Sequence, residues 1–202
     1  PDHFQRCPNI LCTTSTSHET FFGRVHPNTS TLTLLHVSPL VQEQEDLFKE
    51  EHGIFADMPF LRYYLPDIPV TSIVISQKLP WQQHQAALLT LFEQLFDEQT
   101  VFIVSSDFSH YLPLDEAEEM DKQTLATIRT QDLSRIASLQ NPAQSDCPNC
   151  LWLLASLAKK QGFYHPQILQ HTNSAKILRD PNVPETTSHF SISWSEEPRR
   201  EP

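Results

Sequence analysis

The apolar residues of this chain recur in two periods, one typical of strands and one typical of helices. Short apolar runs predict strands at residues 9–13, 31–37, 70–76, 101–105, 167–171 and 188–194. The last run alternates Phe190, Ile192 and Trp194 with serines, as a strand with one buried face does. The run 101–105 is unbroken (Val-Phe-Ile-Val-Ser), so we expect it in the middle of a parallel sheet.

Helical periodicity separates these runs. After the strand predicted at 70–76, an apolar stripe is formed by Leu88, Leu91, Phe92, Leu95 and Phe96. Residues 115–129 predict a helix that opens with acidic side chains and turns Ala117, Leu125 and Ile128 inward. Residues 151–160 predict another helix, which stops before Gly162. Residues 46–64 are expected to be helical in part, with Pro59 near a helix start or a kink.

Because strands and helices alternate, the sequence predicts an α/β fold in a single domain over residues 1–195. The central sheet is expected to be mostly parallel or mixed, with helices on its faces. Residues 196–202, Glu-Glu-Pro-Arg-Arg-Glu-Pro, are expected to be a disordered tail.

Charge and composition argue against several classes of function. The chain has 25 acidic and 14 basic residues and a net charge of −11, which argues against nucleic acid as a partner because phosphate binding needs clustered Lys and Arg. No apolar run approaches the roughly 20 residues that a membrane span needs. Three glycines cannot form a nucleotide-binding glycine loop here. Four cysteines are too few for a disulfide scaffold and no secretory signal precedes the first predicted strand, so we expect a reducing, cytoplasmic location.

A polar segment follows the predicted buried strand 101–105. It reads Ser-Asp-Phe-Ser-His-Tyr from Ser106 to Tyr111 and stands at the carboxyl end of that strand, where open α/β sheets place their ligand sites. Asp107 and His110 together can ligate a metal ion or act as an oriented general base. The competing interpretation is an aspartate that caps the following turn beside a surface histidine.

The cysteines allow three interpretations. Cys147 and Cys150 have the C-x-x-C spacing of a redox pair or of half a zinc site. Cys7 and Cys12 would bring the number of thiols to four, but their spacing, within and before a strand, suits a zinc knuckle poorly. A lone active-site Cys147 is the interpretation that we favour.

The segment from Ser105 to Tyr111 resembles the S-S-D-[FL]-x-H-[WY] signature of the Memo-like family, whose bacterial and archaeal members are called AmmeMemoRadiSam system protein B. Further downstream, the family's A-x3-D-x6-I-x3-D is matched by Ala117, Asp121, Ile128 and Asp132. Upstream, Glu51-His52-Gly53-Ile54 resembles the family's E-H-S-[LI], although Phe55 replaces the glutamate that follows it. Weaker similarity extends the resemblance over about residues 9–194, at residues 14–18, 59–61, 171–174 and 191–194.

The resemblance implies an α/β fold similar to that of class III extradiol dioxygenases of the LigB type, with a non-haem metal site. Carried over to this sequence, the metal ligands are His18, Asp107, His110 and Cys147, with Cys150 as the alternative to Cys147. Asp107 and His110 are also the candidate catalytic residues. The mixed nitrogen, oxygen and sulfur ligands suit iron or copper, and no organic cofactor is expected. We therefore expect His18, Asp107 and His110 to line one pocket.

Two functions are compatible with this resemblance. The first is a metal-dependent oxidoreductase or dioxygenase-like enzyme with an unknown substrate, associated with radical-SAM and AMMECR-type partner proteins as in the family's microbial members. The second is a non-catalytic module whose eroded metal site recognises a partner or a small ligand. The second is favoured because the histidine of the family's P-H-A-G-Y motif has no counterpart in this sequence. Its place lies some tens of residues before His18, so we expect the N-terminal part of the family domain to be missing from this chain.

Overall fold

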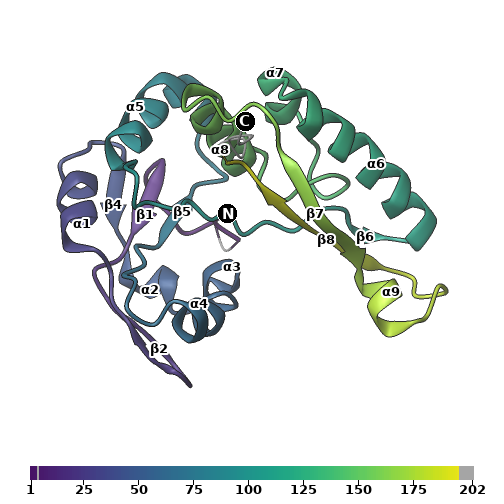
Figure 1. Cartoon of the computed structure of the whole chain (residues 1–202), viewed down its shortest axis with the longest axis horizontal. Coiled ribbons are helices and arrows are strands. Elements are labelled where there is room, and N and C mark those ends of the chain that lie inside the picture. Colours follow the sequence, from purple (N-terminus) through teal and green to yellow (C-terminus); the bar gives the residue numbers. More distant parts are fainter. Residues whose placement is uncertain (4, 196–202) are drawn as a thin grey trace, which may run out of the picture. The chain divides into compact units, whose positions relative to one another are not determined.

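The computed structural model describes residues 1–3 and 5–195 of the chain (Figure 1). The backbone divides into two compact units, residues 1–105 and residues 106–202. Each unit has its own sheets and helices, and the predicted tail 196–202 lies outside the described residues. Among the described residues, no helix combines the length and the apolar character that crossing a bilayer requires.

The N-terminal unit is built on a three-stranded mixed sheet in the order β4-β1-β5. The central strand β1 (Leu11–Thr13) is fully buried. It runs parallel to β4 (Val41–Glu43) and antiparallel to β5 (Ile73–Ile75). A separate hairpin is formed by β2 (His18–Thr20) and β3 (Gly23–Val25).

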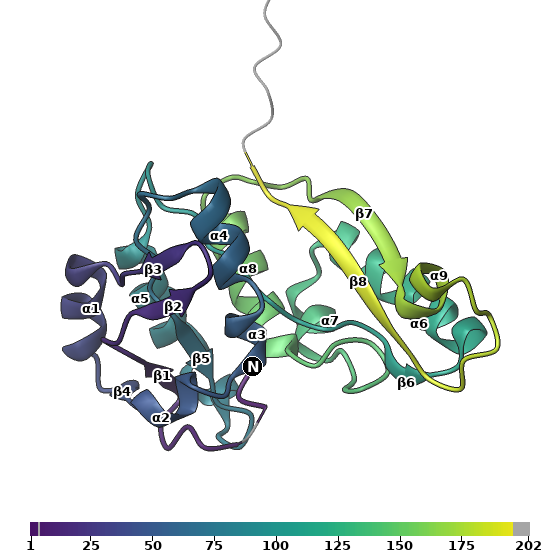
Figure 2. The same ribbon diagram turned by 90° about the horizontal axis from the view of Figure 1, so that it is seen from below.

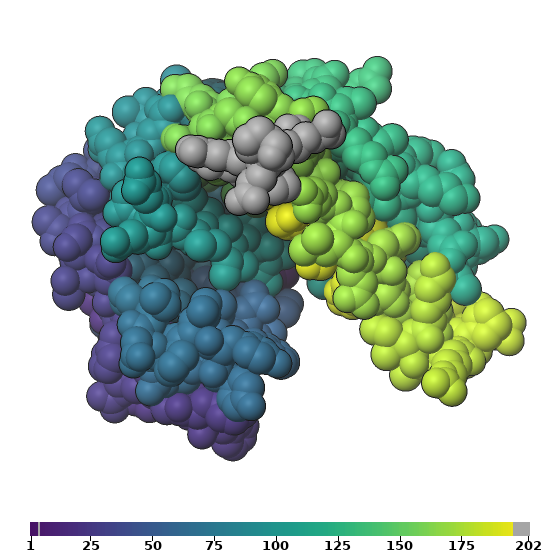
Figure 3. Space-filling view, viewed as in Figure 1, coloured from purple at the N-terminus to yellow at the C-terminus, as the bar shows by residue number. Residues whose placement is uncertain are grey.

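Helices fill the connections between these strands. They are α1 (Thr29–His36), α2 (Glu45–Phe48), α3 (His52–Phe55), α4 (Met58–Tyr64), the 3-10 helix η1 (Trp81–His84) and α5 (Gln85–Leu95). The stripe predicted for α5 is confirmed by the burial of Leu88, Leu91, Phe92 and Leu95. The short helices α2, α3 and α4 confirm that residues 46–64 are helical in part. Pro59 stands in the first turn of α4, which confirms its expected place near a helix start. The space-filling view shows the α4 segment, in blue, at the surface of this unit (Figure 3).

The segment 31–37, predicted as a strand, belongs instead to helix α1. The Asn28 side chain accepts a hydrogen bond from Thr31 N and so caps the first turn. Leu32 and Leu35, three residues apart, are both buried, as one face of a helix requires. The threonine-rich composition favours a strand, but the Asn28 cap and the spacing of the two leucines decide for a helix.

The C-terminal unit contains an antiparallel sheet in the order β6-β8-β7. β7 (Gln167–Asn173) and β8 (Thr186–Ser193) lie side by side as a long ribbon (Figure 2), which confirms both late strands. The short strand β6 (His110–Leu112) pairs with the start of β8.

Strand β6 carries a β-bulge next to His110. His110 and Leu112, two residues apart on β6, pair with consecutive residues of β8. Tyr111 between them is therefore an extra residue, and its φ of 60° lies in the left-handed region. The bulge shifts the register between β6 and β8 directly after His110.

The helices of the C-terminal unit, within its described part, are α6 (Leu114–Thr130), α7 (Leu133–Ala137), α8 (Pro148–Lys160) and α9 (Ser174–Leu178). The inward stripe predicted for α6 is confirmed, since Ala117, Leu125 and Ile128 are buried. Helix α8 begins at Pro148, earlier than predicted, and ends at Lys160 as predicted. Gly162 follows it with a φ of 82°, a backbone conformation that glycine adopts most readily.

The α/β character of the chain is confirmed, but its strands do not form the single central sheet that the sequence predicts. Three small sheets occur in the described residues instead. The only parallel pairing among those residues is that of β1 with β4.

The run 101–105, expected at the centre of a parallel sheet, has no regular secondary structure and pairs with no strand of the described chain. Phe102 packs its ring against Phe92 of α5, with centroids 5.5 Å apart. Val101 and Ile103 are exposed. The apolar run is therefore attached to a helix through an aromatic side chain rather than through a backbone ladder.

Replacing Asn28 with alanine should lower the free energy of unfolding by about 0.5–2 kcal/mol, because the first turn of α1 loses its side-chain cap. Asn28→Asp is the matched control, since aspartate keeps the acceptor and should stay within about 0.5 kcal/mol of the parent. The measurement is chemical denaturation of both variants followed by circular dichroism. Equal stabilities of the two variants would contradict the cap.

Candidate functional site

The polar segment after residue 105 lies along strand β8. Phe108 N donates to Ser188 O (3.1 Å), and Ser188 N donates to Ser109 O (2.8 Å). Phe108 is buried and its ring packs against Phe190, with centroids 4.1 Å apart. These backbone bonds and the apolar anchor fix the position of His110, with which β6 begins.

His110 has a defined tautomer in its neutral form. Its side chain is buried, and Nδ1 lies 2.7 Å from the Phe108 carbonyl oxygen. Because a carbonyl oxygen only accepts hydrogen bonds, Nδ1 carries the proton and Nε2 keeps its lone pair. The backbone N of His110 donates to Pro142 O (3.1 Å). A histidine with one ring nitrogen held by a carbonyl has the usual arrangement of a metal ligand or an oriented base.

Asp107 lies beside the loop that leads into Cys147. Asp146 N donates to Asp107 O (3.0 Å), and Asp146 directly precedes Cys147. The Ser106 hydroxyl donates to Asp146 Oδ1 (2.7 Å) and so holds the same loop. The Asp107 carboxylate is 45% exposed and lies 3.9 Å from His189 Nδ1. Asp107 therefore presents a partly solvated carboxylate next to this loop.

Cys147 is buried at the start of α8 and forms a disulfide with Cys150, where the sequence favours a lone thiol. Its backbone N donates to Ser145 Oγ (3.1 Å). Cys7 and Cys12 form a second disulfide, and the described residues contain no free cysteine. Because a metal ion binds the thiolate, Cys147 becomes a ligand only when its disulfide is reduced.

His18 belongs to the N-terminal unit and begins strand β2. Its ring is buried, and Nε2 lies 2.9 Å from the Ser72 hydroxyl. Ser72 O in turn accepts from the Thr13 hydroxyl (2.9 Å) of strand β1. Burial lowers the pKa of His18, so its imidazole is neutral near neutral pH, which is the form that binds metal ions.

The predicted ligands of the C-terminal unit are close along the backbone, but their side chains are not gathered. Within the described part of this unit, no three ligand atoms of His, Cys, Asp or Glu lie within 4.8 Å of one another. Gathering Asp107, His110 and Cys147 around an ion therefore requires rotation of the half-exposed Asp107 and reduction of Cys147.

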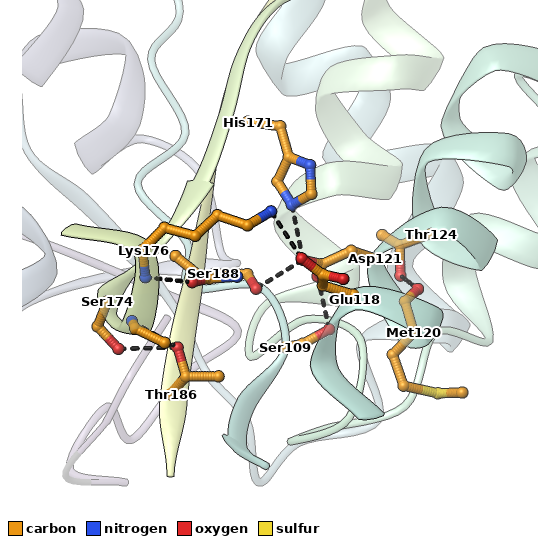
Figure 4. Close-up of polar contacts among 12 residues, drawn as sticks. Ser109, Glu118, Met120, Asp121, Thr124, His171, Ser174, Lys176, Thr186 and Ser188 are labelled. Carbon is orange, nitrogen blue, oxygen red and sulfur yellow. Dashed lines mark hydrogen bonds and ion pairs between the residues drawn. The ribbon is translucent and has the colours of Figure 1, made fainter. Parts of the chain in front are cut away.

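Asp121 has a role that the sequence patterns do not predict. It lies on the inward face of α6 and is fully buried. Its carboxylate accepts hydrogen bonds from three side chains (Figure 4), namely Ser109 Oγ (2.7 Å), Ser188 Oγ (2.6 Å) and His171 Nε2 (2.7 Å). One carboxylate thus joins α6 to the polar segment, β8 and β7. The available signal was an acidic residue on an apolar helix face, between Ala117 and Leu125.

A second group outside the sequence prediction lies in the N-terminal unit and consists of His3, Glu51 and His52. One ligand atom from each side chain lies within 4.8 Å of the other two. His52 begins helix α3, and the Glu51 side chain caps that helix. His3 stands far from both in the sequence, so no spacing pattern indicates the group.

Asp121→Ala should lower the free energy of unfolding by about 3–5 kcal/mol, because it leaves buried hydrogen-bond donors without their acceptor. Glu118→Ala is the matched control on the same helix. Glu118 binds Lys176 Nζ at 2.7 Å (Figure 4), but Lys176 is exposed and Glu118 partly exposed, so loss of this ion pair should cost less than about 1 kcal/mol. Chemical denaturation compares the two variants. Similar losses would show that Asp121 does not organise the unit.

Comparisons with known proteins show which family the chain belongs to. A family model for Memo-like proteins matches residues 1–183. The chain is 24% identical to a MEMO1 family protein of Pyrobaculum aerophilum over 181 residues, which cover 86% of this chain and 63% of that protein. It is 29% identical to a relative from Metallosphaera sedula over 153 residues (73% and 53%) and 30% identical to one from Methanosarcina mazei over 154 residues (71% and 55%).

The chain spans between about half and two thirds of the length of these relatives. The family match nevertheless covers most of the sequence, including the polar segment, the helix that carries Asp121, and Cys147. The chain therefore belongs to the Memo-like family.

Proposed function

We propose that this Memo-like chain binds iron or copper through His110 and Asp107, with Cys147 as the sulfur ligand once its disulfide is reduced. The observation that carries the proposal is the orientation of His110. Its Nδ1–H is held by the Phe108 carbonyl, so Nε2 keeps the lone pair that a metal ion needs. A bound iron or copper ion supplies Lewis acidity and one-electron redox chemistry.

The donor types fit these ions better than they fit magnesium or calcium. Imidazole, carboxylate and thiolate form a mixed set, whereas hard ions take oxygen ligands. Because the proposed site needs a reduced Cys147, we propose a reducing compartment such as the cytoplasm as its location.

Residues around the proposed ligands hold them in place. Asp121 binds the hydroxyl of Ser109, which directly precedes His110. Ser106 and Asp146 hold the loop that leads into Cys147. The partly exposed Asp107 carboxylate can also accept a proton from a substrate.

The activity that we propose is oxidation of a small molecule by an enzyme related in fold to the LigB-type extradiol dioxygenases. The family resemblance supports this fold relationship. It also supports radical-SAM and AMMECR-type proteins as partners.

Replacing His110 with alanine should weaken iron(II) binding by more than about tenfold. Loss of a residue that only hydrogen-bonds to a metal ligand already lowers metal affinity by about 10–100-fold, and His110 is a proposed ligand itself. The free energy of unfolding should fall by no more than about 2 kcal/mol, because the variant loses one side-chain hydrogen bond of a buried ring. The measurements are an anaerobic iron(II) titration and a thermal melt. His36→Ala, which removes a partly exposed histidine on α1, is the control and should change neither.

Two results would contradict this proposal. A His110→Ala variant that melts like the parent and binds iron(II) equally well would show that the segment keeps the family motif without binding the metal ion, and would favour the non-catalytic module. A variant that no longer folds would make the segment a structural network.

The two cysteines of the C-x-x-C pair should respond differently to replacement. Cys150→Ser frees the Cys147 thiol and should bind iron(II) without added reductant. Cys147→Ser should bind more weakly than the parent treated with a phosphine reductant, because serine replaces the proposed sulfur ligand. Iron(II) titrations with and without reductant compare the variants. The opposite order of affinities would assign the ligand to Cys150.

A further inference from the structure

We propose a second metal site, for a divalent transition metal ion, at His3, Glu51 and His52 of the N-terminal unit. The three side chains supply two imidazoles and one carboxylate, and one ligand atom from each lies within 4.8 Å of the other two. This donor set binds zinc(II) and other first-row divalent ions, and it leaves coordination positions for water. None of these residues takes part in the function proposed above.

Glu51 is the fixed member of the site. Its side chain is 1% exposed, and its carboxylate accepts hydrogen bonds from His3 N (3.1 Å) and Gly53 N (3.3 Å). Glu51 Oε1 also contacts His3 Nδ1 and lies 4.0 Å from His52 Nδ1. A buried carboxylate needs a compensating charge or hydrogen bonds. A divalent ion shared with both imidazoles meets that need.

His3 is held in place by its neighbours in the chain. Asp2 N donates to Ile75 O (3.1 Å) of strand β5, and the buried Asp2 carboxylate accepts from Cys7 N (2.8 Å). Cys7 is bonded to Cys12 of strand β1. The beginning of the chain therefore lies against this unit next to α3 (Figure 1, Figure 2). A ligand held in this way loses little freedom when an ion binds.

Gly53 gives His3 the space it occupies. A β-carbon at position 53 would lie 3.3 Å from His3 Cε1 and 3.5 Å from Glu51 Oε1. Gly53 lies inside α3, where alanine would be the better helix former by about 1 kcal/mol, so glycine here indicates a close approach. The Memo-like E-H-S motif has serine at this position.

His52 is the movable member of the site. Its side chain is 65% exposed, and its ring lies against that of His3, with centroids 4.0 Å apart. Ligand atoms about 2.0–2.2 Å from one ion are separated from each other by about 3–4 Å. Closing the group around an ion therefore needs a small rotation of the exposed His52 ring, and the hydrogen bond between His3 Nδ1 and Glu51 is replaced by bonds from both atoms to the ion.

The test is a zinc(II) titration in the His110→Ala background, which removes a ligand of the site proposed in the other unit. This background should still bind zinc(II), and adding His52→Ala should weaken the binding by more than about tenfold. Because His52 is exposed, its replacement should leave the melting temperature unchanged in the absence of metal. The matched control is His26→Ala, an exposed histidine of the same unit, which should bind like the background.

A second variant keeps all three ligands. Gly53→Ala adds only a β-carbon beside His3 and should also weaken zinc(II) binding. In a parallel titration with cobalt(II), the visible absorption of the bound ion should be weaker in this variant than in the background. The proposal is overturned if the background binds no zinc(II), if His52→Ala binds as tightly as the background, or if His26→Ala loses as much. The group would then be an ion pair of His3 and Glu51 with a stacked His52.

Discussion

The buried carboxylate of Asp121 is the interaction on which the C-terminal unit depends. A charge removed from water must be matched by hydrogen bonds, and Asp121 obtains them from Ser109, Ser188 and His171. These partners come from the polar segment, β8 and β7, so satisfying one carboxylate fixes the positions of three separate pieces of chain against α6. The segment before His110 has little regular structure of its own. The network adds side-chain hydrogen bonds to the two backbone bonds that join Phe108 and Ser109 to Ser188 of β8.

Elements with a one-sided apolar stripe could be predicted from the sequence, because burial of that stripe decides their structure. Helices α5 and α6 are of this kind. The segment 31–37 could not, since its threonines favour a strand while the decisive features are the Asn28 cap and the buried leucine pair. The run 101–105 shows the other failure. Its apolar content predicts contact with a core, but not that Phe102 would make that contact with a helix.

The candidate site was predictable only where its chemistry is local in the sequence. Asp107 and His110 stand in one short motif, but the tautomer of His110 depends on where the Phe108 carbonyl points. The partners of Asp121 lie 12, 50 and 67 residues away, and only the folded chain brings them together. His3 and Glu51 are likewise 48 residues apart. Spacing patterns describe neighbours along a helix or strand and carry no information on such pairs.

The backbone at Tyr111 has a consequence for the residue that can stand beside His110. A left-handed φ of 60° costs a residue other than glycine about 1–2 kcal/mol, and glycine would avoid that cost. An aromatic ring is present instead, and it meets the His110 imidazole edge to face with centroids 4.8 Å apart. The phenol ring restricts the libration of the imidazole from one side. Glycine at position 111 would remove the backbone strain but also the ring that confines the His110 imidazole, so the two demands oppose each other at this residue.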